Sequence, residues 1–221
     1  MPHPGLDGSG AVAGVRKSVA APVPKHVGVD REWHHRPCQK GHISRYFLDL
    51  AKSDVFGHKK ELRQEASDDL GWNGVLLRGY RYSALDVIVP PVRDFTIVSY
   101  CRGATSMERQ CEGAWTKTHC APGDVSLLTK SQRSHWHWIE EIDVSHVYLS
   151  EILVSGICAE VTDRCIADVQ LQDVLKSHDP IVTAAVAAIT REAQQQALGS
   201  ALYVEAVATQ LVVHLLRNTH Q

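Results

Sequence analysis

The sequence predicts a mainly β domain followed by α-helices, with antiparallel strands first and helices last. Short apolar or alternating segments recur between positions 75 and 150, and turn residues such as Gly and Pro separate them. Helical patterns replace this alternation after Ser150. Short strands at intervals of about 8 to 12 residues are typical of an antiparallel sandwich or barrel.

Turn chemistry divides the β region into separate strands. Pro90-Pro91 ends one strand, and tight turns are expected at Arg102-Gly103 and Glu112-Gly113. The predicted strands are Val75 to Tyr82, Asp86 to Val89, Phe95 to Cys101, Thr105 to Cys111, Ala114 to His119, Val125 to Thr129, His135 to Ile139 and Asp143 to Leu149.

Capping residues delimit the expected helices. Ser150 is a plausible N-cap for a helix over Glu151 to Val161, and Asp179 precedes a proline suited to a first helical position. That second helix is expected to run from Pro180 to Leu198, with Gly199 as its stop, and a last helix covers Ala201 to Arg217.

The predicted organisation has three parts. Residues 1–40 are rich in Gly, Pro, Ala and Ser without periodicity and are expected to form a flexible extension. Residues 41–150 hold the barrel, with a charged, weakly helical stretch over 54–69, and residues 151–221 form the helical segment.

Bulk properties narrow the possible functions. The chain has 221 residues, 44% of them hydrophobic, and a formal net charge of −2 with 23 basic against 25 acidic side chains. This balance argues against specific duplex-DNA binding by the chain itself. No apolar run approaches the roughly 20 residues of a membrane span, and the N-terminus lacks a signal pattern, so we expect a cytoplasmic location. The six cysteines form no CxxC pair and are expected to be small buried side chains.

The region from Ala121 to Ser150 reads as the wall of a small-molecule pocket. Strand alternation puts Trp136 and Trp138 on one face and His135 and His137 on the other. The predicted ligand-binding residues combine apolar surface with polar donors, and an early-strand arginine is added for an anionic or hydroxylated effector: Trp136, Trp138, His146, Tyr148 and Arg81. Ordinary barrel core and a solvated arginine are the alternative interpretation.

An ordered set of motifs also carries a family resemblance. Gly71-Trp72-Asn73-Gly74, Pro90-Pro91, Pro122-Gly123-Asp124, Trp136-x-Trp138, His146-x-Tyr148 and the helix from Leu202 to Arg217 follow one another along the chain. Together they resemble the N-terminal effector domain of AraC-type transcriptional regulators. The resemblance implies a cupin-like barrel that binds a small effector, helices that dimerise, and DNA binding only through a helix-turn-helix domain, which would lie beyond Gln221.

The last helix carries an apolar stripe formed by Val204, Val207, Leu211 and Leu215. Two interpretations stay open. The stripe can be intramolecular core, or its outer edge can form the homodimer contact that the resemblance implies.

The alternative function is a metal-dependent cupin enzyme. His135-x-His137 with Glu140 resembles the metal motif of catalytic cupins, and two alternate histidines on one strand can bind one ion. The earlier strand Thr105 to Cys111 offers no further histidine, however. No GxSxG elbow or Gly-rich phosphate loop is present. We therefore expect no catalysis, no resident metal and no cofactor.

Overall fold

The computed structural model describes residues 61–91, 94–129, 133–162, 169 and 171–219, all within the compact unit Gly41–Gln221. The flexible extension expected at 1–40 and the start of the 54–69 stretch lie outside the described residues.

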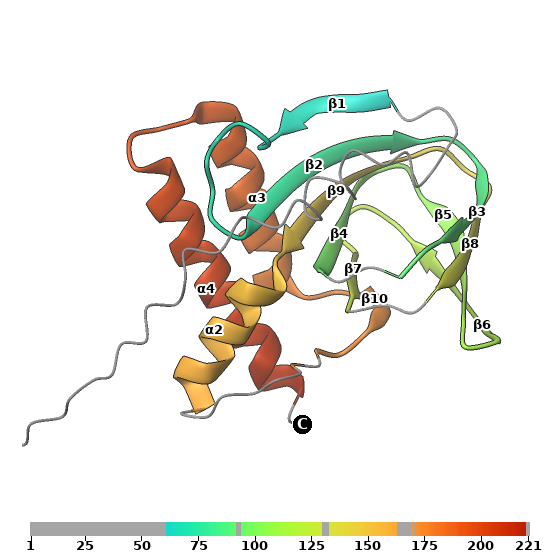
Figure 1. Ribbon diagram of the computed structural model, residues 1–221. Helices are drawn as coiled ribbons and strands as arrows, with labels where there is room; N and C mark the ends of the chain where they lie inside the picture. Colours follow the sequence, from blue (N-terminus) through green and yellow to red (C-terminus); the bar gives the residue numbers. More distant parts are fainter. Residues whose placement is uncertain (1–60, 92–93, 130–132, 163–168, 170, 220–221) are drawn as a thin grey trace, which may run out of the picture. The chain divides into compact units, whose positions relative to one another are not determined.

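Two antiparallel sheets form the β part, which confirms the predicted cupin-like antiparallel architecture (Figure 1). The six-stranded sheet has the order β1-β2-β9-β4-β7-β10, and the four-stranded sheet has the order β3-β8-β5-β6. The strands are β1 Glu61–Ala66, β2 Val75–Tyr82, β3 Leu85–Val89, β4 Phe95–Arg102, β5 Thr105–Cys111, β6 Ala114–Cys120, β7 Val125–Leu128, β8 Ser134–Trp138, β9 Ile142–Leu149 and β10 Val174–Ser177.

The six-stranded sheet is apolar on both faces because it separates two cores. On β9, Val147 and Leu149 pack outward against the helices, while Ile142 and Val144 point into the barrel. This alternation follows from the period of two along a strand. A strand buried on both faces reads as a nearly continuous apolar run, as β2 and β4 do.

The helices follow strands β1 to β9, as predicted, and α3 and α4 lie against the outer face of the six-stranded sheet (Figure 1). Asp179 caps α3 by accepting hydrogen bonds from the backbone amides of Ile181 and Val182. The Ser150 hydroxyl likewise accepts from the amide of Leu153. No helix among the described residues is long and apolar enough to cross a membrane. The helices are α2 Glu151–Thr162, α3 Pro180–Gln195 and α4 Ser200–Thr219.

Three elements differ from the sequence prediction. Part of the stretch expected to be weakly helical is strand β1, which pairs with β2. The region between α2 and α3 returns to the sheet as β10, which pairs with β7 at the edge. Helix α3 ends at Gln195, because Gln196 adopts a left-handed conformation with φ 47° and its amide bonds the carbonyl of Glu192. The predicted stop at Gly199 is therefore three residues late.

Candidate functional site

A cavity of about 80 Å³ lies inside the barrel, between the two sheets. Strand β8 presents the indoles of Trp136 and Trp138 to it, and β9 presents His146. Most of the lining is apolar or aromatic, with a few polar groups, which is the composition of ligand sites. The described lining residues are Tyr82, Val89, Asp94, Thr96, Val98, Tyr100, Met107, Arg109, Leu128, Thr129, Ser134, Trp136, Trp138, Ile142, Val144 and His146.

Strand alternation orients β8 as the sequence predicts. Trp136 and Trp138 are 9% and 4% exposed. The side chains of His135 and His137 are on the other face, 32% and 38% exposed. Each indole nitrogen has a partner: Trp136 donates to the Ser134 hydroxyl at 2.9 Å, and Trp138 to the Ser83 carbonyl at 2.9 Å. The rings are thus held in fixed orientations at the cavity wall.

An aromatic cluster surrounds His146. The His146 ring meets Tyr80 edge-on with centroids 4.9 Å apart, and Tyr82 lies 6.0 Å away. Nδ1 of His146 and the Tyr148 hydroxyl share a hydrogen bond of 3.0 Å. Tyr82 in turn meets Trp138 edge-on at 5.6 Å. His146 is therefore placed by contacts from β2 and from its own strand.

Two tyrosines give the cavity neutral polar groups. Burial, together with the nearby Tyr80, raises the pKa of Tyr82 well above its usual value. Burial, reinforced by Cys120, also raises the pKa of Tyr100, although a hydrogen bond with Ser126 opposes the rise. Both phenols therefore stay protonated at neutral pH. The Tyr100 hydroxyl donates to Ser126, because the Ser126 hydroxyl itself donates to the Leu175 carbonyl.

A partly buried cation completes the lining. Arg109 on β5 is the cross-strand neighbour of Trp136, and its guanidinium carbon lies 5.4 Å from that ring's centroid. The guanidinium also bonds the carboxylate of Asp173, which lies just before β10. A cation over an indole face is a favourable arrangement in a partly desolvated site.

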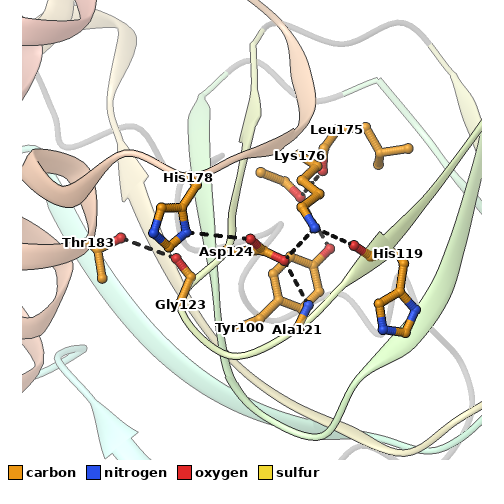
Figure 2. Close-up of polar contacts among 10 residues, drawn as sticks. Tyr100, His119, Ala121, Gly123, Asp124, Leu175, Lys176, His178 and Thr183 are labelled. Carbon is orange, nitrogen blue, oxygen red and sulfur yellow. Dashed lines mark hydrogen bonds and ion pairs between the residues drawn. The ribbon is translucent and has the colours of Figure 1, made fainter.

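Asp124 in the Pro122-Gly123-Asp124 turn has a structural role, through the polar contacts drawn in Figure 2. The buried Asp124 carboxylate accepts from the Ala121 amide at 2.9 Å and pairs with the Lys176 ammonium at 2.9 Å. Lys176 also donates to the His119 carbonyl at 2.6 Å. Burial alone would raise the pKa of Asp124, but the bonds from Lys176 and Ala121 outweigh it and lower the pKa. This network holds β10 against the ends of β6 and β7.

The structure brings together only some of the predicted ligand-binding residues. Trp136, Trp138 and His146 line the cavity. Tyr148 shares a hydrogen bond with His146 but is not among the described lining residues. Arg81 lies on the opposite face of the sheet, where its Nε donates to Asp143 at 2.8 Å. The arginine at the cavity is instead Arg109.

The proposed interface residues on α4 are buried within the chain itself. Val204 and Leu211 are 0% exposed and Leu215 is 6% exposed, and all three belong to the core between helices and sheet. Val207 is partly buried and packs against the same core. This burial favours the interpretation of the stripe as intramolecular core. The large apolar side chains exposed on α4 are Leu202 and Tyr203, at 73% and 48%.

The alternative metal site lies on the outside of the barrel. His135 bonds Asp86, and Nδ1 of His137 lies 3.7 Å from the same carboxylate. Glu140 instead bonds Thr105. In the described part of the chain, no group of three or more His, Cys, Asp or Glu side chains is arranged to hold a metal ion. Neither histidine points into the cavity.

Comparisons with known proteins show only remote likeness. No protein-family model and no curated protein matches the chain. Apo ToxT from Vibrio cholerae is 13% identical, with a TM-score of 0.48, over 67% of this chain and 58% of ToxT. The AraC-like transcriptional activator CuxR is 8% identical, with a TM-score of 0.46, over 66% of this chain and 53% of CuxR. EutQ of Clostridium difficile is 9% identical, with a TM-score of 0.35, over 44% of this chain and 75% of EutQ.

The chain thus spans little more than half the length of ToxT and of CuxR. A further ToxT structure, 14% identical, contains an unsaturated fatty acid.

Proposed function

We propose that the barrel binds a small-molecule effector, and that the chain is the effector-sensing and dimerisation part of an AraC-type transcriptional regulator. The observation that supports ligand binding best is the interior cavity, where two fixed indoles, an imidazole and a guanidinium converge. The regulatory assignment rests on the ordered motifs of the sequence. In this proposal a helix-turn-helix domain outside the sequence contacts DNA, and the protein works in the cytoplasm.

The size of the cavity limits the effector. About 80 Å³ is well below the roughly 300 to 1,000 Å³ of sites that enclose drug-sized ligands. A compact ligand, or one end of a longer one, fits without rearrangement. Anything larger must move side chains or extend through the mouth of the barrel.

A binding role accounts for the polar groups better than catalysis does. The lining tyrosines remain protonated, Arg109 is paired, and the two histidines of the metal alternative face outward. We therefore propose a non-enzymatic function that needs no resident metal or cofactor.

The test is a ligand screen with two readouts. The purified chain is titrated with small sugars, aromatic acids and short aliphatic acids while tryptophan fluorescence and thermal stability are recorded. At least one class should change the fluorescence and raise the melting temperature, since a ligand that binds only the folded state stabilises it. If no class changes either signal at millimolar concentration, the proposal is contradicted. Stoichiometric metal in the purified protein, with activity that depends on it, would favour the enzyme alternative.

A further inference from the structure

Arg109 lines the cavity, as does the acidic residue Asp94, whereas the ion-pair partner of Arg109 is Asp173, which is not among the described lining residues. The Arg109 side chain is 11% exposed, and that of its partner Asp173 is 29% exposed. Among the described residues, Asp173 is the only carboxylate in ion-pair contact with Arg109. A carboxylate contributed by the chain itself therefore occupies the one arginine in the described lining.

We propose that Asp173 is an internal substitute for a ligand carboxylate, and that the barrel takes a compact carboxylic acid whose anion replaces Asp173 on Arg109. This inference rests on the proposed ligand-binding function of the same cavity. It assigns Arg109 as the residue that selects the ligand and Asp173 as the residue that competes with it.

The difference in exposure favours the exchange. A guanidinium removed from water requires a counter-ion, because an unpaired buried charge is costly. Arg109 therefore keeps a carboxylate partner in either state. The more exposed Asp173 can return to water with little loss, since ion pairs near the surface contribute little net stability. The ligand thus has to displace only a weakly held partner.

The surroundings of Arg109 keep it in position during the exchange. Arg109 and Trp136 are directly opposed on neighbouring strands, and the guanidinium carbon lies 5.4 Å from the indole centroid. A guanidinium presents a rigid planar set of donors that matches a carboxylate. A ligand with an apolar body could pack on the indoles while its carboxylate meets this cation.

Release of Asp173 from Arg109 would also affect the surroundings of α4. Asp173 accepts from the Thr129 amide at 3.4 Å and directly precedes β10, an edge strand whose pairing with β7 is irregular. Leu171, Gln172 and Val174 line a second cavity of about 70 Å³, together with Leu215 and Asn218 of α4. A change at Asp173 is thus adjacent to the last turns of the final helix.

The experiment compares a charged probe with its neutral counterpart. Benzoate and benzamide are titrated into the full chain, and binding is followed by the NMR signals of the indole N–H groups of Trp136 and Trp138. Arg109→Gln should weaken benzoate binding by about 10- to 100-fold, and Asp173→Asn should strengthen it by about 2- to 10-fold. Benzamide binding should stay unchanged in both variants. Arg109→Lys keeps the charge but not the planar donors, so its affinity for benzoate should lie between that of wild type and that of Arg109→Gln.

Glu108→Gln is the matched control for Asp173→Asn. It removes the same charge from the residue next to Arg109, but on the outer face, where Glu108 pairs with Lys117. Benzoate should bind this variant as it binds wild type. Hydrogen exchange gives an independent readout. In wild type, the amides of 171–177 should exchange faster when benzoate is present but not when benzamide is present. In Asp173→Asn, the same amides should exchange faster than in wild type even without a probe.

The outcomes separate this inference from the proposed function. Equal binding of both probes, unaffected by Asp173→Asn, would leave the ligand cavity standing and overturn the role of Asp173. An effect of Glu108→Gln as large as that of Asp173→Asn would also overturn it, because net charge alone would then explain the result. If neither probe perturbs the indole signals at millimolar concentration, the inference fails, whereas the proposed ligand-binding function is decided by the broader ligand screen.

Discussion

Trp136 and its neighbour His135 lie on opposite faces of β8: the indole lines the barrel cavity, and the imidazole bonds Asp86 on the outer face. One substitution at each position therefore tests the two faces separately within a single strand. The same pair distinguishes a cavity that binds ligand through the indoles from a metal site built on the histidines.

Trp136→Ala should weaken binding of the effector identified in the screen. The lost aromatic contact corresponds to about 1 to 3 kcal/mol, which is an affinity loss of about 5- to 150-fold. His135→Ala should leave the affinity almost unchanged, because its side chain does not line the cavity. Calorimetric titration measures both, with circular dichroism to confirm folding. Loss of binding in His135→Ala alone would make the outer face the functional one.

Leu211→Ala should destabilise the chain by about 2 to 5 kcal/mol, because it leaves a cavity at a fully buried position in the core. Leu202→Ala is the matched change on the same helix. Leu202 is 73% exposed, so the effect should stay within about 0.5 kcal/mol. Urea denaturation measures both free energies of unfolding. Similar values for the two variants would contradict the placement of Leu211.

The proposed homodimer should depend on Leu202 rather than on the buried stripe. Leu202→Glu places a charge on the exposed apolar part of α4 next to Tyr203 and should shift the protein to monomers without unfolding it. Light scattering and circular dichroism give the two readouts. A folded Leu202→Glu variant that remains dimeric would exclude this part of α4 from the interface.

Asp179 should make stability depend on pH. Burial alone would raise the pKa of Asp179, but hydrogen bonds from His214 and from the amides of Val182 and Ile181 outweigh it and lower the pKa. A lowered folded-state pKa stabilises the fold above the unfolded value of about 3.9, and this contribution is lost as the pH falls through the folded value. Wild type should therefore lose stability in that range.

Two substitutions separate the cap from the charge. Asp179→Ala removes the cap of α3 and should cost about 0.5 to 2 kcal/mol at pH 7. Asp179→Asn keeps a capping oxygen without the charge, so it should lose less unfolding free energy relative to wild type than Asp179→Ala does. This loss should shrink as the pH falls below about 4. Urea unfolding from pH 7 to pH 3 measures this difference. A deficit that stays constant over the whole range would rule out the charge as its cause.

The sequence predicted most of the fold because local signals agreed with tertiary structure. Turn residues mark the ends of β2 and β5 so clearly that the predicted and observed limits coincide. Strand β1 was missed because Glu61–Ala66 consists mostly of good helix formers, and its pairing with β2 overrides that propensity. Strand β10 has only four residues, too few for a visible period.

The site was predictable only where alternation is clear. On β8, small and aromatic residues alternate with histidines, so the inward face could be identified. On β2, Leu76 and Leu77 are both apolar because both faces are buried, so the sequence pattern does not show that Arg81 points away from the cavity. The inward position of Arg109 follows from the alternation of Thr105 and Met107 on β5, which is visible in the sequence. Asp173 reaches Arg109 across 64 positions of sequence, which no local pattern encodes.

Gly103→Ala should be more harmful than Gly113→Ala, although both glycines occupy turns with positive φ, +76° and +84°. A side chain at such angles costs about 1 to 2 kcal/mol in either turn. A Cβ at Gly113 would meet nothing within 4 Å, so this conformational cost is the whole effect. A Cβ at Gly103 would overlap the backbone carbonyl of Glu141, which cannot move aside as a flexible side chain can. Thermal unfolding of the two variants should therefore show a clearly larger loss for Gly103→Ala. Equal losses would mean that the turn after β4 does not approach Glu141 as closely as the structure has it.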